Sequence, residues 1–141
     1  DRVSLMPPAL ETIDRSSLFE SLDAKARKQL AADMTERRFA AGEEMSTEDR
    51  GGVGFFLIAE GTASVSVKGT PKGQLLPGMH YGEMALLTGG TRGATITADT
   101  DVQCWVLSQW HFKPLVQGEP EIAWKLLQEL AHRVRSYQSA S

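Results

Sequence analysis

The sequence predicts an α+β fold, in which an antiparallel, jelly-roll-like β-roll is flanked by N-terminal helices and a long C-terminal helix. Three observations predict it. Apolar residues recur every four positions near the N-terminus, alternate with polar residues through the middle, and return to helical spacing near the C-terminus. This order is typical of a β-roll with its helices gathered at one end. At 141 residues, the chain is expected to form one domain with its own core.

The N-terminal part is expected to be helical after a lead-in segment over residues 1–13. Short helices with one buried face are predicted over residues 14–38, because the apolar positions there keep a four-residue spacing. These positions are Leu18, Leu22, Ala26, Leu30 and Met34.

The β-roll is expected over residues 39–107. Its predicted strands are residues 55–58, 62–67, 74–76, 94–98 and 102–106. Turn-forming residues over 68–73 predict that the second and third of these strands form a hairpin.

Helices are expected again over residues 108–138, a short one over 110–116 and a longer one that begins at Pro120. The longer helix has two apolar groups: Ile122 and Leu126 can face the β-roll, and a second set follows coiled-coil-like spacing. That second set is Ala123, Leu127, Leu130, Val134 and Tyr137. Two interpretations stay open: a single helix packed on its own domain, or a two-fold homodimer through this helix.

Residues 81–95, called the cassette below, carry the strongest functional signal. Gly82 and Glu83 precede one apolar helical turn, and a Gly-Gly turn then leads to Arg92 and a strand. A helix start with an arginine aimed at it suits a phosphate. Because like charges repel, Glu83 is better interpreted as an acceptor for hydroxyls such as those of a ribose. The combination predicts a nucleotide ligand.

The cassette resembles the phosphate-binding cassette of the cyclic nucleotide-binding domain family, in which an arginine follows the Gly-Glu pair by the same nine-residue interval that separates Glu83 from Arg92. The resemblance covers roughly residues 14–138. It includes, outside the cassette, Phe39–Met45, Phe55–Gly61, Thr95–Leu107 and Glu119-Pro120.

The resemblance implies roles for several residues of the cassette and for one residue of the last helix. Arg92 would pair with the exocyclic phosphate oxygens, and Glu83 with Gly82 would hold the ribose 2′-hydroxyl. Backbone N–H groups would add to the phosphate contacts, and an aromatic ring on the last helix would stack on the purine. The full set of expected ligand-binding residues is Gly82, Glu83, Met84, Ala85, Arg92, Gly93, Ala94 and Tyr137.

The chain departs from the family pattern at three places. Thr91 stands where proline is frequent, and the loop over residues 46–54 lacks the usual Glu-Gly-Asp sequence. Gly93 carries no hydroxyl, whereas members that prefer cyclic GMP often have Thr or Ser there. This last departure favours cyclic AMP over cyclic GMP as the ligand.

Other function classes have little support. The net charge of −3 and pI near 5.6 argue against direct nucleic-acid contact. Cys104, the only cysteine, is expected to be a buried, inert thiol, and His80, His111 and His132 lack metal-ligand spacing. No catalytic motif is present, and no apolar stretch approaches the ~20 residues that cross a bilayer. We therefore expect a non-enzymatic, cytoplasmic protein without a metal or membrane insertion.

These observations predict a regulatory sensor domain that binds a cyclic mononucleotide and transmits occupancy through its helices. The chain begins at Asp1 without methionine, which we interpret as a fragment of a longer protein with a fused effector domain. Two alternatives remain: the truncated sensor half of a DNA-binding transcription regulator, or a structural or protein-interaction domain that kept the fold without the ligand.

Overall fold

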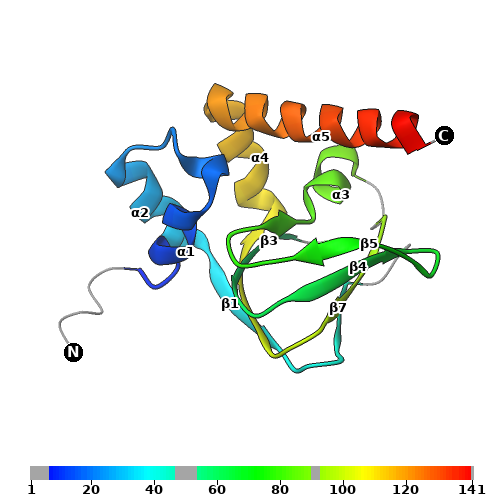
Figure 1. Cartoon of the computed structure of the whole chain (residues 1–141). Coiled ribbons are helices and arrows are strands. Elements are labelled where there is room, and N and C mark those ends of the chain that lie inside the picture. Colours follow the sequence, from blue (N-terminus) through cyan, green and yellow to red (C-terminus); the bar gives the residue numbers. More distant parts are fainter. Residues whose placement is uncertain (1–6, 47–53, 90–92, 141) are drawn as a thin grey trace.

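Two four-stranded antiparallel sheets form the β-roll, with strand orders β1-β8-β3-β6 and β2-β7-β4-β5 (Figure 1). The computed structural model describes residues 7–46, 54–89 and 93–140. The strands are β1 (Thr35–Phe39), β2 (Glu44–Ser46), β3 (Gly54–Glu60), β4 (Ala63–Val67), β5 (Thr70–Leu75), β6 (His80–Tyr81), β7 (Thr95–Ala98) and β8 (Val102–Ser108). The helices are α1 (Leu10–Arg15), the 3-10 turn η2 (Ser17–Phe19), α2 (Ala24–Asp33), α3 (Glu83–Thr88), α4 (Gln109–Gly118) and α5 (Pro120–Ala140). The expected α+β β-roll with flanking helices is confirmed.

Strand β3 contributes to two hydrophobic cores, one inside the roll and one between the roll and the helices. All its residues from Gly54 to Ala59 are buried. Because successive strand side chains point to opposite faces, Phe56 and Ile58 pack inside the roll, whereas Phe55 and Leu57 pack against the helices. A continuous apolar run is therefore what this position requires.

The interior of the roll holds Cys104, which is fully buried next to Ile58 and Ala63. Burial raises the pKa of the Cys104 thiol to about 12, against a smaller opposing effect of Arg37. The thiol is therefore protonated at neutral pH and a poor nucleophile, as the sequence predicted.

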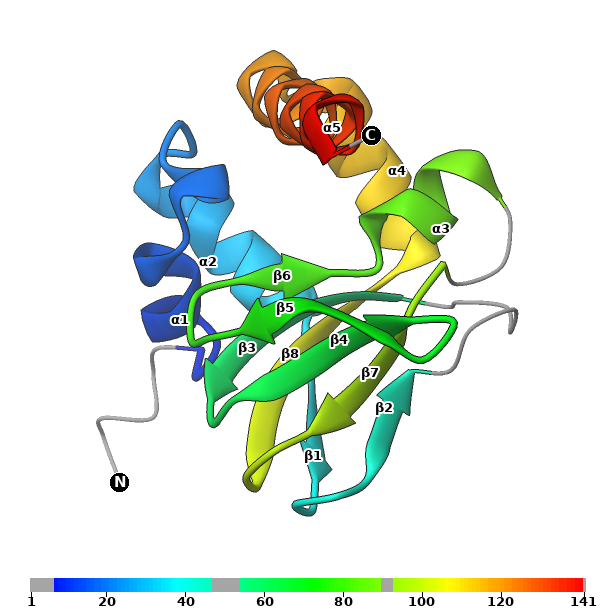
Figure 2. The ribbon, with the colours of Figure 1, turned by 45° about the vertical axis from the view of Figure 1, so that its right-hand side comes forward.

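The helices cover the outer face of the β3–β8 sheet, and α5 runs across the top of the molecule (Figures 1 and 2). Ile122 and Leu126 of α5 are 0% and 2% exposed and join the same cluster as Phe55, Phe112 and Leu107. The expectation that these two residues face the roll is confirmed. Among the described residues, no helix combines the length and apolar character that crossing a bilayer demands.

Two element boundaries near the N-terminus differ from the predicted ones. Helix α1 begins at Leu10, inside the expected lead-in, because Ile13 is buried in the helical core and packing holds so short a helix in place. Strand β1 begins at Thr35, four residues before the roll was expected to start. Its first four residues are exposed and mostly charged, so it shows no apolar alternation, and its pairing with β8 defines it.

The β4–β5 hairpin has a shorter turn than predicted. Lys68 and Gly69, at φ of 50° and 78°, form the whole turn, as in tight hairpins that need positive φ at both central residues. Strand β5 begins at Thr70, although Pro71 and Gly73 are typical turn residues. Because β5 is an edge strand, it tolerates both of them.

Gly61 lies where the chain packs closely against the backbone of Asp101. It lies at φ +88°, and a Cβ there would stand 2.1 Å from the Asp101 carbonyl oxygen. We expect Gly61→Ala to lower the free energy of unfolding by about 2 kcal/mol more than Gly42→Ala, because overpacking adds to the backbone strain. Gly42 has the same φ of +88° and open space around its Cβ position. The difference between the two variants therefore measures the cost of the close contact alone. Equal losses in denaturant unfolding of the two variants would contradict this.

Candidate functional site

The backbone conformation at the start of the cassette depends on one glycine. Gly82 lies between β6 and α3 at φ 103°, a backbone conformation that side chains with a Cβ rarely adopt. It turns the chain so that Glu83 becomes the first residue of α3. The first backbone hydrogen bond of this helix runs from the Leu86 N–H to the Gly82 carbonyl. The Ala85 N–H therefore precedes the helix's own hydrogen-bond ladder.

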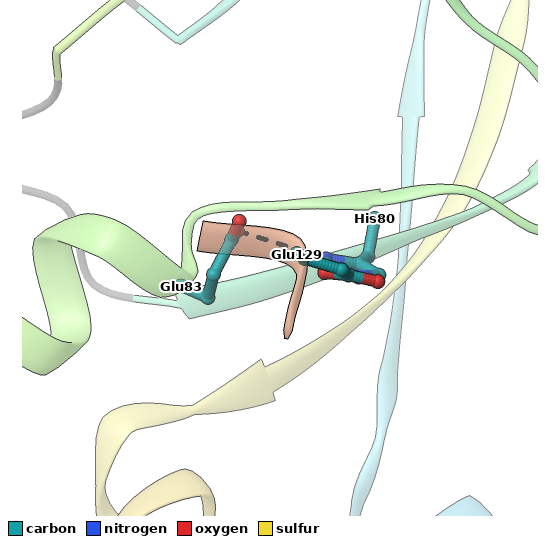
Figure 3. Close-up of side chains that lie close together, drawn as sticks. All are labelled: His80, Glu83 and Glu129. Atoms are coloured by element: carbon teal, nitrogen blue, oxygen red, sulfur yellow. Dashed lines mark hydrogen bonds and ion pairs between the residues drawn. The ribbon is translucent and has the colours of Figure 1, made fainter. Parts of the chain in front are cut away.

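Glu83 is a buried carboxylate, with 2% of its side chain exposed. Its Oε2 lies 3.6 Å from Nδ1 of His80 (Figure 3). Its Oε1 accepts a hydrogen bond from Nη2 of Arg133 on α5 at 2.8 Å. Burial by itself would raise the pKa of Glu83. The hydrogen bond and charge of His80, with the charge of Arg133, outweigh burial and lower it. Glu83 is therefore ionised at neutral pH, as an acceptor for hydroxyls must be.

His80 lies between two carboxylates. Its Nε2 is 3.0 Å from Oε2 and 3.2 Å from Oε1 of Glu129 on α5, and its Nδ1 faces Glu83. Its ring stacks on Phe55 at a centroid distance of 5.1 Å. Burial would lower the pKa of His80, but the hydrogen bonds and charges of Glu129 and Glu83 together raise it to about 9.

His80, Glu83 and Glu129 bring potential ligand atoms within 4.8 Å of one another. A chelate would need one imidazole nitrogen and both carboxylates to converge on a point. Here each ring nitrogen faces a different carboxylate. This is the arrangement of an imidazolium paired on both sides, so a proton explains the cluster.

The other ligand residues predicted from the sequence differ in how exposed they are. Ala85 is 6% exposed and Met84 is 49% exposed on α3. Gly93 is exposed, and Ala94 is half-buried against the interior of the roll. Arg92 lies outside the described residues, and of Tyr137 only the backbone, in α5, is described. The assignment of ligand contacts to these residues stays a prediction.

Three residues of this site were missed from the sequence: His80, Glu129 and Arg133. Glu129 and Arg133 are four residues apart, so they lie on one face of α5. This charged pair on the helix that carries the buried Ile122 and Leu126 was the only hint in the sequence that α5 also makes polar contacts with the domain. Nothing in the sequence shows that its partners are His80 and Glu83, about fifty positions earlier.

The end of β1 and the start of β8 lie away from α3, at the other end of the roll (Figure 2), and residues there line a hollow of about 280 Å³. Its lining includes Arg38 near the end of β1, Glu60 at the end of β3 and Asp101 just before β8. Because one cationic and two acidic side chains line it, it offers no single-sign site for a phosphate. We therefore place the candidate site at the cassette.

Comparison with known proteins gives consistent matches. The family described as cyclic nucleotide-binding domain matches residues 36–119. The cGMP-dependent protein kinase egl-4 of Caenorhabditis briggsae is 33% identical over 107 residues, covering 76% of this chain and 14% of the kinase. The cAMP-dependent protein kinase regulatory subunit of Debaryomyces hansenii is 30% identical over 108 residues, covering 75% of this chain and 24% of the subunit.

The catabolite activator protein of Thermus thermophilus has a solved structure that matches with a TM-score of 0.79 at 25% identity, over 89% of this chain and 61% of that chain. This chain spans a quarter or less of the length of the two kinase-related proteins. The family match includes the cassette and covers more than half of the 141 residues. The chain therefore belongs to the cyclic nucleotide-binding domain family.

Proposed function

We propose that this domain is a regulatory sensor that binds a cyclic mononucleotide at the cassette, with cyclic AMP preferred over cyclic GMP. The observation that carries the proposal is the buried, ionised Glu83 that follows a glycine at positive φ. A carboxylate has about four acceptor positions. Glu83 can therefore accept a ribose hydroxyl while Arg133 keeps its hydrogen bond.

The phosphate would be held by charge and by backbone donors. Arg92 would pair with the exocyclic oxygens through its guanidinium fork. The Ala85 N–H, which precedes the first hydrogen bond of α3, would add a donor, as would the N–H groups of Gly93 and Ala94. With the phosphate held by these donors, Glu83 is left to bind the ribose, and its carboxylate stays apart from the negative phosphate.

The base would meet the C-terminal helix. Tyr137 would stack on the purine, and Gly93, without a hydroxyl, favours cyclic AMP. Because Arg133 of α5 already contacts Glu83, binding at the cassette and the position of α5 are linked. Occupancy would be transmitted as a shift in the population of α5 positions.

The proposal is tested by thermal unfolding with cyclic AMP, cyclic GMP and cyclic dinucleotides. A ligand at 100 times its dissociation constant adds ~2.7 kcal/mol to the free energy of unfolding. We expect cyclic AMP to stabilise the domain most, and a competition titration to give it the tighter binding. No stabilisation by any of these ligands would favour the alternative of a structural domain without a ligand.

We further propose that the domain acts without catalysis of its own and controls an effector domain or subunit. The similarity to kinase-related proteins supports a kinase as that effector, and the similarity to a catabolite activator protein supports a transcription regulator. The two differ in the remainder of the parent open reading frame: a kinase domain or kinase-binding segment in the first case, a helix-turn-helix in the second.

A homodimer through α5 is a separate proposal. In the apolar set with coiled-coil-like spacing on α5, Leu127 and Val134 are 59% and 56% exposed, whereas Ala123 and Leu130 are half-buried. We expect the sedimentation coefficient to indicate a dimer, and the L127E/V134E double variant to sediment as a monomer. Trp110→Gln, which changes an exposed apolar residue of α4, should leave the dimer intact. A monomeric parent protein would refute the proposal.

A further inference from the structure

Four charged side chains connect α5 to the cassette region. His80 and Glu83 come from β6 and the start of α3, and Glu129 comes from α5 (Figure 3). Arg133 follows Glu129 by four residues on the same face of α5 and contacts Glu83. Two pairs cross between these elements: His80 with Glu129 and Glu83 with Arg133. With His80 protonated, two positive and two negative groups balance.

The two pairs differ in their relation to the ligand. Glu83 belongs to the expected nucleotide contacts, whereas His80 and Glu129 do not. The His80 side chain is 9% exposed and lies against the ring of Phe55, which itself stacks on Phe112 of α4. His80 is therefore fixed in the core, and Glu129 ties α5 to that fixed point.

We propose that His80 and Glu129 form a latch that holds α5 against the cassette and so sets the affinity for the nucleotide without touching it. The inference rests on the proposed function, because it assigns the latch to that same site. Where binding requires α5 to be docked, the apparent affinity falls with the docked fraction.

The charged and titratable groups that face His80 come from two elements. Glu83 of α3 faces Nδ1, and Glu129 of α5 faces Nε2, while Arg133 of α5 reaches the far oxygen of Glu83. Strand β3 contributes the uncharged Phe55. Since both carboxylates favour the imidazolium, the pKa of His80 is about 9. The latch is therefore closed at neutral pH and opens as the pH rises past about 9.

The first experiment measures α5 in the ligand-free domain. We expect His80→Gln and Glu129→Gln each to raise hydrogen exchange over residues 120–138 by about tenfold. Because the two residues form one pair, the double variant should exchange little faster than either single variant. The matched controls are His132→Gln and Glu121→Gln, which change exposed residues of the same helix and should leave exchange unchanged.

The second experiment measures cyclic AMP affinity by calorimetry. Each latch variant is expected to bind about five- to tenfold more weakly at neutral pH. The affinity of the parent domain should fall as the pH rises past about 9, and that of His80→Gln should not show this fall. A merely structural role for His80 would not produce this pH dependence.

The outcomes separate the two proposals. If the parent domain binds no cyclic nucleotide, the proposed function fails, and exchange in α5 still decides whether the latch exists. If the domain binds nucleotide but the variants exchange and bind like the parent, the latch is refuted. Losses that simply add in the double variant would also refute it, because they would show two independent contacts.

Discussion

Replacing Arg92 with alanine is expected to weaken cyclic nucleotide binding by at least about tenfold. A hydrogen bond to a charged group contributes about 1.5–3 kcal/mol, and each 1.4 kcal/mol is a factor of ten. The proposed guanidinium fork makes two such bonds to the phosphate. Isothermal titration calorimetry with cyclic AMP measures the change directly. Because the side chain is expected to face the ligand, the free energy of unfolding without nucleotide should change little.

Two further variants sharpen this result. Arg92→Lys keeps the charge and loses the fork, so its affinity should fall between those of the parent and the alanine variant. Arg38→Ala removes the same charge from an exposed site, 70% accessible, at the other end of the roll. It should bind like the parent. Unaltered binding in Arg92→Ala would show that the cassette assignment is wrong.

The fold was largely predictable because its apolar patterns are local. The run at Phe55–Ile58 indicated a buried strand, and the spacing of Ile122 and Leu126 indicated the buried face of α5. The boundaries that were wrong lie where tertiary contacts decide. Strand β1 is mostly charged on its exposed residues and is defined by its pairing with β8, which no local pattern encodes.

The site was predictable only in part, for the same reason. The glycine and carboxylate at the start of α3 are adjacent in sequence, and the structure places them as expected. The partners of Glu83 are long-range: Arg133 is fifty residues later, and His80 is fixed by its stacking on Phe55. A histidine that is isolated in the sequence is part of a partly buried charge network in the structure, because α5 packs across it.

Glu83→Ala is expected to impair both ligand binding and the protein without ligand. It removes the proposed ribose acceptor, and it leaves buried His80 with one carboxylate instead of two. We expect a loss of about 2 kcal/mol in the free energy of unfolding, the typical penalty for a buried group that loses its partner. Arg133 adds little to this penalty, because it is 46% exposed and can turn to water.

The matched control for this loss is Glu36→Ala. It removes a carboxylate that lies 2.9 Å from Arg38 and also accepts a hydrogen bond from Gln103; the side chains of Arg38 and Glu36 are 70% and 39% exposed. Exposed pairs contribute about 0–1 kcal/mol, so denaturant unfolding should show a much smaller loss than in Glu83→Ala. Equal losses in the two variants would contradict the importance of burial at the cassette.

The pH dependence of unfolding distinguishes the network from simple packing. The pKa of His80 is raised from 6.5 to about 9 in the folded protein. Its stabilisation is therefore complete below pH 6.5 and is lost as the pH rises through about 9, an effect on the order of 3 kcal/mol. The pKa of Glu83 is lowered instead, so its stabilisation is present above 4.5 and is lost only in acid.

In the parent domain, the free energy of unfolding should therefore decline from near neutral pH toward about 9. Burial of Cys104 raises its thiol pKa from 9.0 to about 12. This shift lowers the free energy of unfolding only above pH 9.0, where the thiol of the unfolded chain begins to ionise. The decline below pH 9 thus reports on His80. In Glu83→Ala it should be smaller and end at a lower pH, because one of the two carboxylates that raise the pKa of His80 is gone. An unchanged profile in that variant would mean that Glu83 does not stabilise the imidazolium, and that packing alone accounts for its burial.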